Sequence, residues 1–127
     1  MIALIDYGSG NVRSVFNALK SLGADVRLTA DPAEISRAEK IVLPGVGAFG
    51  DCVRGLEERG LWHVMRDMLD SGVPFLGICV GYQMLFEESE ESPGVRWNIC
   101  ELSVSFLTNW QQPKHCFLLV HRVSKWL

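Results

Sequence analysis

Residues 73–86 read VPFLGICVGYQMLF, and no other stretch of the chain says more about its architecture. Residues 73–78 form a short apolar run of the kind found in buried strands, and residues 80–88 are predicted as a helix. Between the two, residues 77–81 have the pattern G-x-C-x-G. This is the thiol counterpart of the G-x-S-x-G nucleophile elbow, in which a nucleophile stands at the tip of a strand-to-helix turn. The stretch therefore predicts a nucleophilic cysteine at Cys79.

The flanks of Cys79 suit this chemistry. The positive end of the following helix would favour thiolate over thiol. The backbone N–H of Val80 would then lie where a tetrahedral oxyanion forms. The alternative is that Cys79 is a small buried apolar residue, as free cysteines usually are.

Residues 44–50, PGVGAFG, follow another expected strand and should lie at the same sheet edge as Cys79. A glycine-rich backbone at this edge could offer N–H groups to an oxyanion or admit a substrate closely. An ordinary strand-to-helix turn explains the same residues equally well.

The rest of residues 1–93 alternates short apolar runs with amphipathic stretches. Strands are predicted over 2–5, 25–28, 41–43 and 73–78, and helices over 12–22, after Asp31-Pro32, from an Asp51 cap to Glu58, and over 61–69. This alternation predicts an α/β fold with a parallel sheet and helices on both faces. Ligands of such sheets gather at the carboxyl ends of the strands.

Composition excludes several classes of function. The chain has 127 residues, enough for about one domain, and its net charge of −3 does not suggest a nucleic-acid surface. None of the four cysteines forms a Cys-x-x-Cys pair, so no metal site is expected. There is neither a membrane-length apolar run nor a basic signal-peptide region, which makes cytoplasmic location the default. Residues 8–11 lack the third glycine of a dinucleotide loop, because Arg13 stands there.

Composition changes near Pro93. Residues 1–93 contain eight Lys/Arg and fourteen Asp/Glu, whereas residues 94–127 contain four Lys/Arg and one acid, Glu101. No glycine follows Gly94, and no alanine follows Ala48. Residues 102–106 and 117–120 could form a small β element. The interpretation we favour is that 94–127 is an atypical tail produced by a frameshift or truncation.

Three segments together resemble one family: residues 6–15 (DYGSGNVRSV), 43–52 (LPGVGAFGDC) and 77–86 (GICVGYQMLF). The third is typical of class I glutamine amidotransferases, and the first two resemble the glutaminase subunit of imidazole glycerol phosphate synthase. The resemblance covers residues 1–93. It implies a flavodoxin-like class I glutamine amidotransferase fold whose C-terminal half is missing. It also implies cofactor-free hydrolysis of glutamine to glutamate and ammonia, with ammonia passed to a (β/α)8-barrel cyclase partner in histidine biosynthesis.

The resemblance also implies roles for individual residues. Cys79 would be the nucleophile, and the oxyanion would be held by Val80 and the backbone at Val46 and Gly47. Gly47 and Gln83 would help to hold glutamine. A partner-facing loop would consist of Gly8, Ser9, Gly10 and Asn11.

The family's catalytic His-x-Glu motif does not occur in these 127 residues. His63, His115 and His121 are followed two places later by methionine, phenylalanine and valine. A cysteine nucleophile needs a base to form the thiolate and an acid to expel ammonia. We therefore expect little glutaminase activity from this chain by itself. Three alternatives stay open: another intracellular cysteine hydrolase, which Gln83 and residues 44–51 speak against, a non-catalytic synthase-binding protein, and a non-functional fragment.

Overall fold

The structure, a computed structural model, describes residues 1–9 and 11–85, together with the backbone path of residues 118–121. The elements follow one another in the order β1 (Ile2–Ile5), α1 (Val12–Ser21), β2 (Val26–Thr29), α2 (Pro32–Ile35), β3 (Lys40–Gly45), α3 (Phe49–Glu58), α4 (Trp62–Asp70), β4 (Phe75–Cys79), α5 (Val80–Gln83) and β5 (Leu118–His121).

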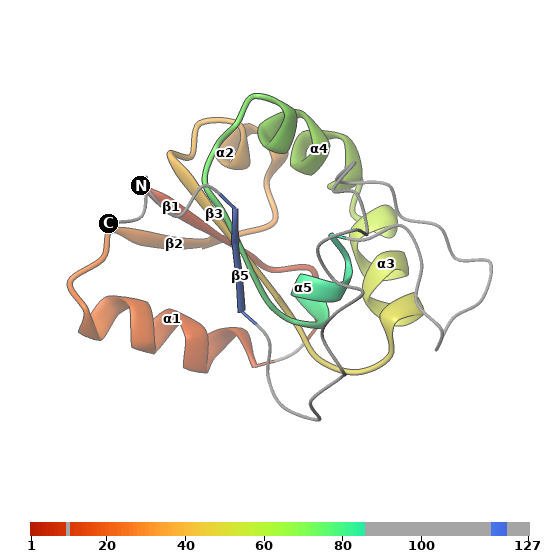
Figure 1. The fold of residues 1–127 in the computed structure, drawn as a ribbon, viewed down its shortest axis with the longest axis horizontal. Helices are drawn as coiled ribbons and strands as arrows, with labels where there is room; N and C mark the ends of the chain where they lie inside the picture. The colour runs from red at the N-terminus through yellow and green to blue at the C-terminus, as the bar shows by residue number, and fades with distance from the viewer. Residues whose placement is uncertain (10, 86–117, 122–127) are drawn as a thin grey trace, which may run out of the picture.

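The strands form one sheet in the order β2-β1-β3-β4-β5 (Figure 1). The first four strands run parallel, and β5 pairs antiparallel with β4. The order 2-1-3-4 is that of a flavodoxin-like sheet. The predicted parallel α/β fold is therefore confirmed, and all four predicted strands are present within one or two residues at each end.

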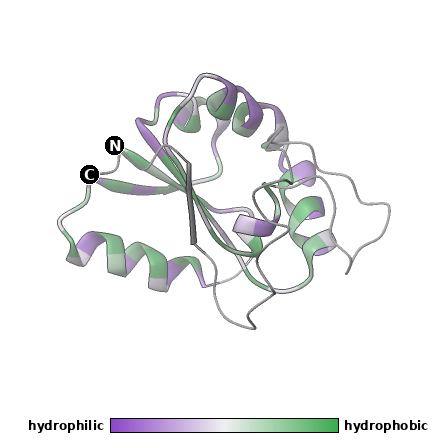
Figure 2. Ribbon diagram, viewed as in Figure 1, coloured by the Kyte–Doolittle hydropathy of each residue, from purple (hydrophilic) through white to green (hydrophobic). Residues whose placement is uncertain are grey.

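Alternate residues of the buried strands supply two separate cores, one on each face of the sheet. On one face, Ala3, Ile5 and Leu43 pack with apolar residues of α2, α3 and α4. On the other face, Leu4 and Val42 pack with half-buried residues of α1. Figure 2 shows the strands largely in the hydrophobic colour and both colours on the helices. The prediction of helices on both faces is thus confirmed, with α1 alone among the described helices on the second face.

Two predicted boundaries were wrong. Helix α3 begins at Phe49 rather than after an Asp51 cap, because Ala48 has extended backbone angles (φ −74°, ψ 140°) and the fully buried Phe49 already belongs to the helix. Asp51 lies instead in the first turn, where its charge still suits the positive end of the helix. Strand β3 does not stop at Leu43 but continues through Gly45, which pairs with Cys79.

Strand β5 lies against the edge of β4, in register with Phe75 to Ile78. Four parallel strands alone would leave this edge open. The predicted run over 117–120 therefore corresponds to a strand, and the edge of β4 is paired. The acidic run 87–92 and residues 102–106, which could form a strand, lie outside the described residues. A third predicted boundary also differs: the helix predicted over 80–88 ends at Gln83, and Met84 is its C-cap residue. Within the described part of the chain, no helix combines the length and apolar character that a bilayer crossing requires.

Candidate active site: the Cys79 elbow

Cys79 stands at a strained turn between β4 and α5. Its backbone angles are φ 55° and ψ −120°, and it is the sole non-glycine residue with positive φ in the described part of the chain. A side chain with a Cβ atom rarely adopts this conformation, and holding it there costs about 1–3 kcal/mol. The Cys79 side chain is half-buried, in contrast with Val80 beside it, which is buried. Strain of this kind concentrates at functional sites, so the geometry agrees with the predicted nucleophile elbow.

The glycines of the G-x-C-x-G pattern are needed for close packing. A Cβ atom built on Gly81 would lie 1.9 Å from the carbonyl oxygen of Leu43, and one built on Gly77 would lie 2.7 Å from the Cα atom of Tyr82. Neither contact can be relieved without moving backbone. In the structure the unusual φ belongs to Cys79, and the glycines let the elbow fold back onto the end of β3.

The end of β3 places residues 44–47, called the oxyanion loop below, beside the elbow formed by residues 77–81. Gly45 is the register partner of Cys79 in the parallel pairing of β3 with β4, so Val46 and Gly47 follow immediately beside Cys79. Val46 is 57 % exposed, and Gly47 is also exposed with φ +103°. The two residues that the sequence analysis placed in this region are therefore accessible to a ligand.

Helix α5 has four residues, Val80 to Gln83. The electrostatic assistance that such a short helix can give a thiolate is smaller than the full helix predicted over 80–88 would provide. Val80 is its first residue, and a backbone N–H in the first turn has no acceptor within the helix. The predicted role of the Val80 N–H as an oxyanion donor is thus compatible with its position. Gln83 is exposed on the same short helix.

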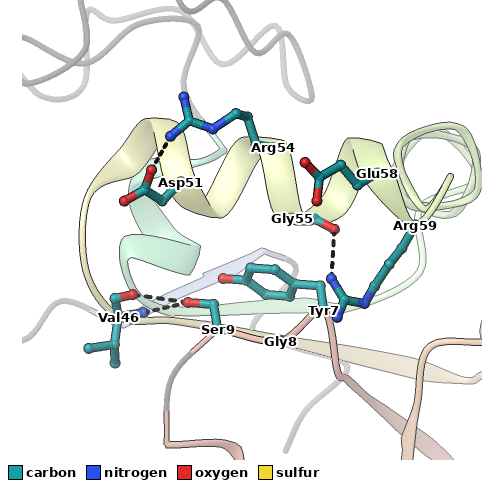
Figure 3. Close-up of a pocket in the computed structure, with 9 residues that line it drawn as sticks. All are labelled: Tyr7, Gly8, Ser9, Val46, Asp51, Arg54, Gly55, Glu58 and Arg59. Carbon is teal, nitrogen blue, oxygen red and sulfur yellow. Dashed lines mark hydrogen bonds and ion pairs between the residues drawn. The ribbon is translucent and has the colours of Figure 1, made fainter.

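Three residues that the sequence analysis did not single out as a group, Tyr7, Ser9 and Cys52, bond to the backbone of Pro44 and Val46. The Tyr7 hydroxyl donates to the Pro44 carbonyl at 2.7 Å. The Ser9 hydroxyl donates to the Val46 carbonyl at 2.9 Å and accepts from the Val46 N–H at 3.3 Å (Figure 3). The Cys52 thiol lies 3.3 Å from the Ser9 oxygen and 3.6 Å from the Val46 carbonyl. No pattern in the sequence marks these contacts, because Tyr7 and Ser9, in the segment after β1, bond to residues 37 positions away in the chain.

A groove of about 420 Å³ lies between α3 and the segment that follows β1. Ser9 and Val46 line one part of it, and Arg54 and Glu58 of α3 line another, together with Arg59, which follows the helix (Figure 3). It opens between the carboxyl ends of β1 and β3, where the order of the sheet reverses. Open α/β sheets bind their ligands at this switch point.

The remaining predicted residues are placed as follows. Gly8 is exposed with φ +84°, and Asn11 is the exposed residue at the start of α1, where its side chain accepts from the Ser14 hydroxyl at 2.7 Å. Gly10 lies outside the described residues. His63 is exposed on α4, as expected of a surface residue. His115 is outside the described residues, and His121 lies in β5.

The chain matches the family model of class-I glutamine amidotransferases over residues 3–115. It is 54% identical over 95 residues to the imidazole glycerol phosphate synthase subunit HisH of Methanothermobacter thermautotrophicus, a match that covers 75% of this chain and 47% of that protein. It is 54% identical over 94 residues to the protein of the same name from Bacillus cereus, covering 74% and 45%. For the Thermus thermophilus protein of that name the identity is 52% over 93 residues, covering 73% and 47%.

The chain therefore spans about half the length of the curated relatives it matches. The family model, by contrast, matches most of the chain, and it includes the β3 end, the Cys79 elbow and the segment that follows β1. The matched residues thus contain the site whose geometry is described above. On this evidence the chain belongs to the class-I glutamine amidotransferase family.

Proposed function

We propose that the protein carrying this chain is a glutaminase that hydrolyses glutamine to glutamate and ammonia with Cys79 as nucleophile. The observation that supports this most directly is the strained conformation of Cys79, with φ 55°, at a strand-to-helix turn inside the matched family segment. Strain persists only where the surrounding structure enforces it. Here the close contacts at Gly77 and Gly81 enforce it.

The proposed chemistry has two steps. The Cys79 thiolate attacks the side-chain amide carbon of glutamine and forms a tetrahedral oxyanion, which the N–H groups of Val80 and of the Val46–Gly47 backbone would stabilise. The C–N bond then breaks, ammonia leaves after accepting a proton, and a thioester remains that water hydrolyses to glutamate. Gly47 and Gln83 would contact the bound glutamine. The acid and base must come from residues other than a His-x-Glu pair of this chain, since residues 1–127 contain none.

We also propose that the protein works as one half of a heterodimer in the cytoplasm. The relatives are named as subunits of imidazole glycerol phosphate synthase, which supports a partner of the (β/α)8-barrel cyclase type in histidine biosynthesis. The residues offered to the partner would be Gly8, Ser9, Gly10 and Asn11. The exposure of Gly8 and Asn11 at the carboxyl edge of the sheet supports this assignment.

Affinity labelling tests the nucleophile and its substrate together. The chain is treated with 6-diazo-5-oxo-L-norleucine, a glutamine analogue that alkylates cysteine nucleophiles, and the labelled residue is mapped by mass spectrometry. We expect modification at Cys79, protection by glutamine, and no modification of that position in Cys79→Ala. Modification of Cys79 by iodoacetamide but not by the analogue would instead favour another cysteine hydrolase.

A second candidate function is docking on the synthase without catalysis. The absence of His-x-Glu from residues 1–127 favours it for this chain taken alone. Titration of the chain into a purified cyclase subunit, followed by an ammonia assay with glutamine, separates the two. Binding with no ammonia would support docking. Ammonia release at the rate of a complete subunit would exclude it.

We infer that the segment closely similar to the curated relatives, which align over 95 and 94 residues, ends near Pro93, and that residues 94–127 are an atypical tail, although the family model itself extends to residue 115. The reversal of charge and the loss of glycine and alanine support this boundary. Resequencing the DNA that encodes residues 85–127 tests it. A second reading frame that continues with a His-x-Glu motif would show a frameshift, whereas its absence would show that the tail is genuine.

A further inference from the structure

The oxyanion loop is fixed by side chains that do not reach the reacting atoms. We call Tyr7, Ser9 and Cys52 the backing cluster. Its members come from the segment after β1 and from α3, and their polar atoms bond to the backbone of Pro44 and Val46. Figure 3 shows the bonds between Ser9 and Val46.

Tyr7 bonds to the backbone at Pro44. Its side chain is 1 % exposed, and its hydroxyl donates to the Pro44 carbonyl at 2.7 Å. Burial raises the pKa of the Tyr7 phenol well above its ordinary value, so the hydroxyl keeps its proton and remains a donor. The Tyr7 hydroxyl gives the Pro44 carbonyl a hydrogen-bond donor, and its removal would leave this carbonyl without that donor.

Gly45 lies close to both the Tyr7 hydroxyl and the backbone of the elbow. A Cβ atom built on Gly45 would lie 2.9 Å from the Tyr7 hydroxyl oxygen and 2.6 Å from the backbone nitrogen of Gly81. The space that a Cβ atom of residue 45 would need is therefore occupied by the Tyr7 hydroxyl and by the backbone of the elbow. Because Gly45 is also the register partner of Cys79, a shift of the phenol contact changes the position of the loop relative to the nucleophile.

Cys52 and Ser9 bond to the backbone at Val46. Both bond to the Val46 carbonyl, at 3.6 Å and 2.9 Å, and they contact one another at 3.3 Å. Cys52 is 1 % exposed, so its thiol is enclosed by protein. The Val46 carbonyl thereby has donors from α3 and from the segment after β1, which restrict rotation of the peptide that follows it.

We propose that Tyr7 and Cys52 are positioning residues of the glutaminase site: they hold the Pro44 and Val46 carbonyls and so set the Val46–Gly47 backbone beside Cys79. The catalytic role that this proposal gives to Tyr7 and Cys52 rests on the proposed glutaminase function. The geometric part can be tested without it.

The first test measures the loop in the free chain. Backbone ¹⁵N order parameters are compared among wild type, Tyr7→Phe, Cys52→Ala and Cys52→Ser. We expect values for Val46 and Gly47 near 0.85 in wild type and Cys52→Ser, and below about 0.6 in Tyr7→Phe and Cys52→Ala. Ala3 and Leu28, in the remote β1–β2 pair, should keep their wild-type values in all four.

The matched control is Thr29→Val, which removes a buried hydroxyl that accepts from the Asp31 N–H at 3.0 Å, away from the elbow. This variant should lower the melting temperature and leave the order parameters of Val46 and Gly47 unchanged. If Tyr7→Phe behaves like this control, Tyr7 only stabilises the fold and the proposal is wrong.

The second test measures the consequence at Cys79. The rates of its modification by 6-diazo-5-oxo-L-norleucine and by iodoacetamide are compared in the same variants. We expect the ratio of the two rates to fall at least about tenfold in Tyr7→Phe and Cys52→Ala and to recover in Cys52→Ser. An unchanged ratio overturns the proposal. If the analogue does not label the wild-type chain, the proposed glutaminase function is contradicted instead. The order parameters of Val46 and Gly47 then test the positioning role of Tyr7 and Cys52 by themselves.

Discussion

Cys79 has a backbone conformation that favours glycine, although its chemistry requires a side chain. The cost of about 1–3 kcal/mol for such a conformation is offset by the packing of the elbow against β3. Natural sites often retain strain of this kind, at the expense of stability, because function depends on it.

Replacement of Cys79 by glycine and by alanine measures this strain. Glycine normally destabilises a strand or helix by about 0.5–1 kcal/mol relative to alanine, but here it removes the clash of Cβ with the backbone. We therefore expect Cys79→Gly to be more stable than Cys79→Ala by about 1 kcal/mol in urea unfolding. The reverse order would show that the turn is not strained in solution.

The buried Tyr7 phenol makes the free energy of unfolding depend on pH in the alkaline range. Burial raises the pKa of its phenol, so the folded chain keeps a proton that the unfolded chain loses above a pKa of about 10. The unfolded state then binds fewer protons than the folded state, and the free energy of unfolding falls as pH rises. This contribution is complete below pH ~10 and is lost above it.

We expect thermal unfolding of the wild type to shift to lower temperature above pH ~10, and this dependence to be weaker in Tyr7→Phe. Scans by circular dichroism between neutral pH and pH ~11 would measure it. Equal slopes in the two proteins would assign the alkaline effect to other groups, among them Tyr82, whose pKa burial also raises.

Helix α2 has a true side-chain cap and α3 does not. The Asp31 carboxylate accepts from the Ala33 N–H at 2.9 Å, and Asp31 has extended backbone angles (φ −87°, ψ 116°). Asp51, which the sequence suggested as a cap, is inside α3 and pairs with Arg54 on the exposed surface. Both aspartates precede amphipathic stretches, so spacing alone could not distinguish them.

The two helix starts provide a matched pair of variants. Asp31→Ala should lower the free energy of unfolding by about 1 kcal/mol, the usual cost of losing an N-cap. Asp51→Ala should cost less than about 0.5 kcal/mol, because exposed ion pairs contribute little and the first-turn charge effect is small. Urea titrations of both variants would show the difference. Equal losses would mean that the Asp31 bond does not persist in solution.

Strand β5 changes the properties of the whole molecule. It pairs with β4 along residues 75–78, at the edge that four parallel strands would leave open. Unpaired strand edges are sites of aggregation, because their N–H and C=O groups can pair with another chain. Pairing of this edge therefore opposes the aggregation that we would expect of the four-stranded sheet alone.

Deletion of residues 118–127 should increase self-association, since it removes β5. Deletion of residues 122–127 is the matched control, because it shortens the chain but keeps the strand. We expect light scattering at a fixed protein concentration to rise for the first deletion and not for the second. Equal scattering from both would show that β5 does not protect this edge.

The sequence was sufficient to predict the elements that depend on local patterns. Apolar runs and helical spacing between glycine and proline turns located β1, β2 and β4 closely, and the G-x-C-x-G pattern located the elbow at Cys79. Strand alternation with helices was sufficient for the parallel sheet, because parallel strands need crossovers and their apolar faces need cover. The family resemblance of residues 1–93 rests on the same local segments.

Other features depended on contacts between residues distant in the chain. The bonds from Tyr7 to Pro44 and from Ser9 to Val46 join residues 37 positions apart, and the Ser9–Cys52 contact joins residues 43 positions apart. The register of Gly45 with Cys79 likewise depends on the pairing of two separate strands, β3 and β4. The reason for Gly77 and Gly81 also became apparent only when β3 and the elbow were seen in contact. Local patterns indicate which side of an element is apolar, but the close packing of one backbone against another depends on the positions of both.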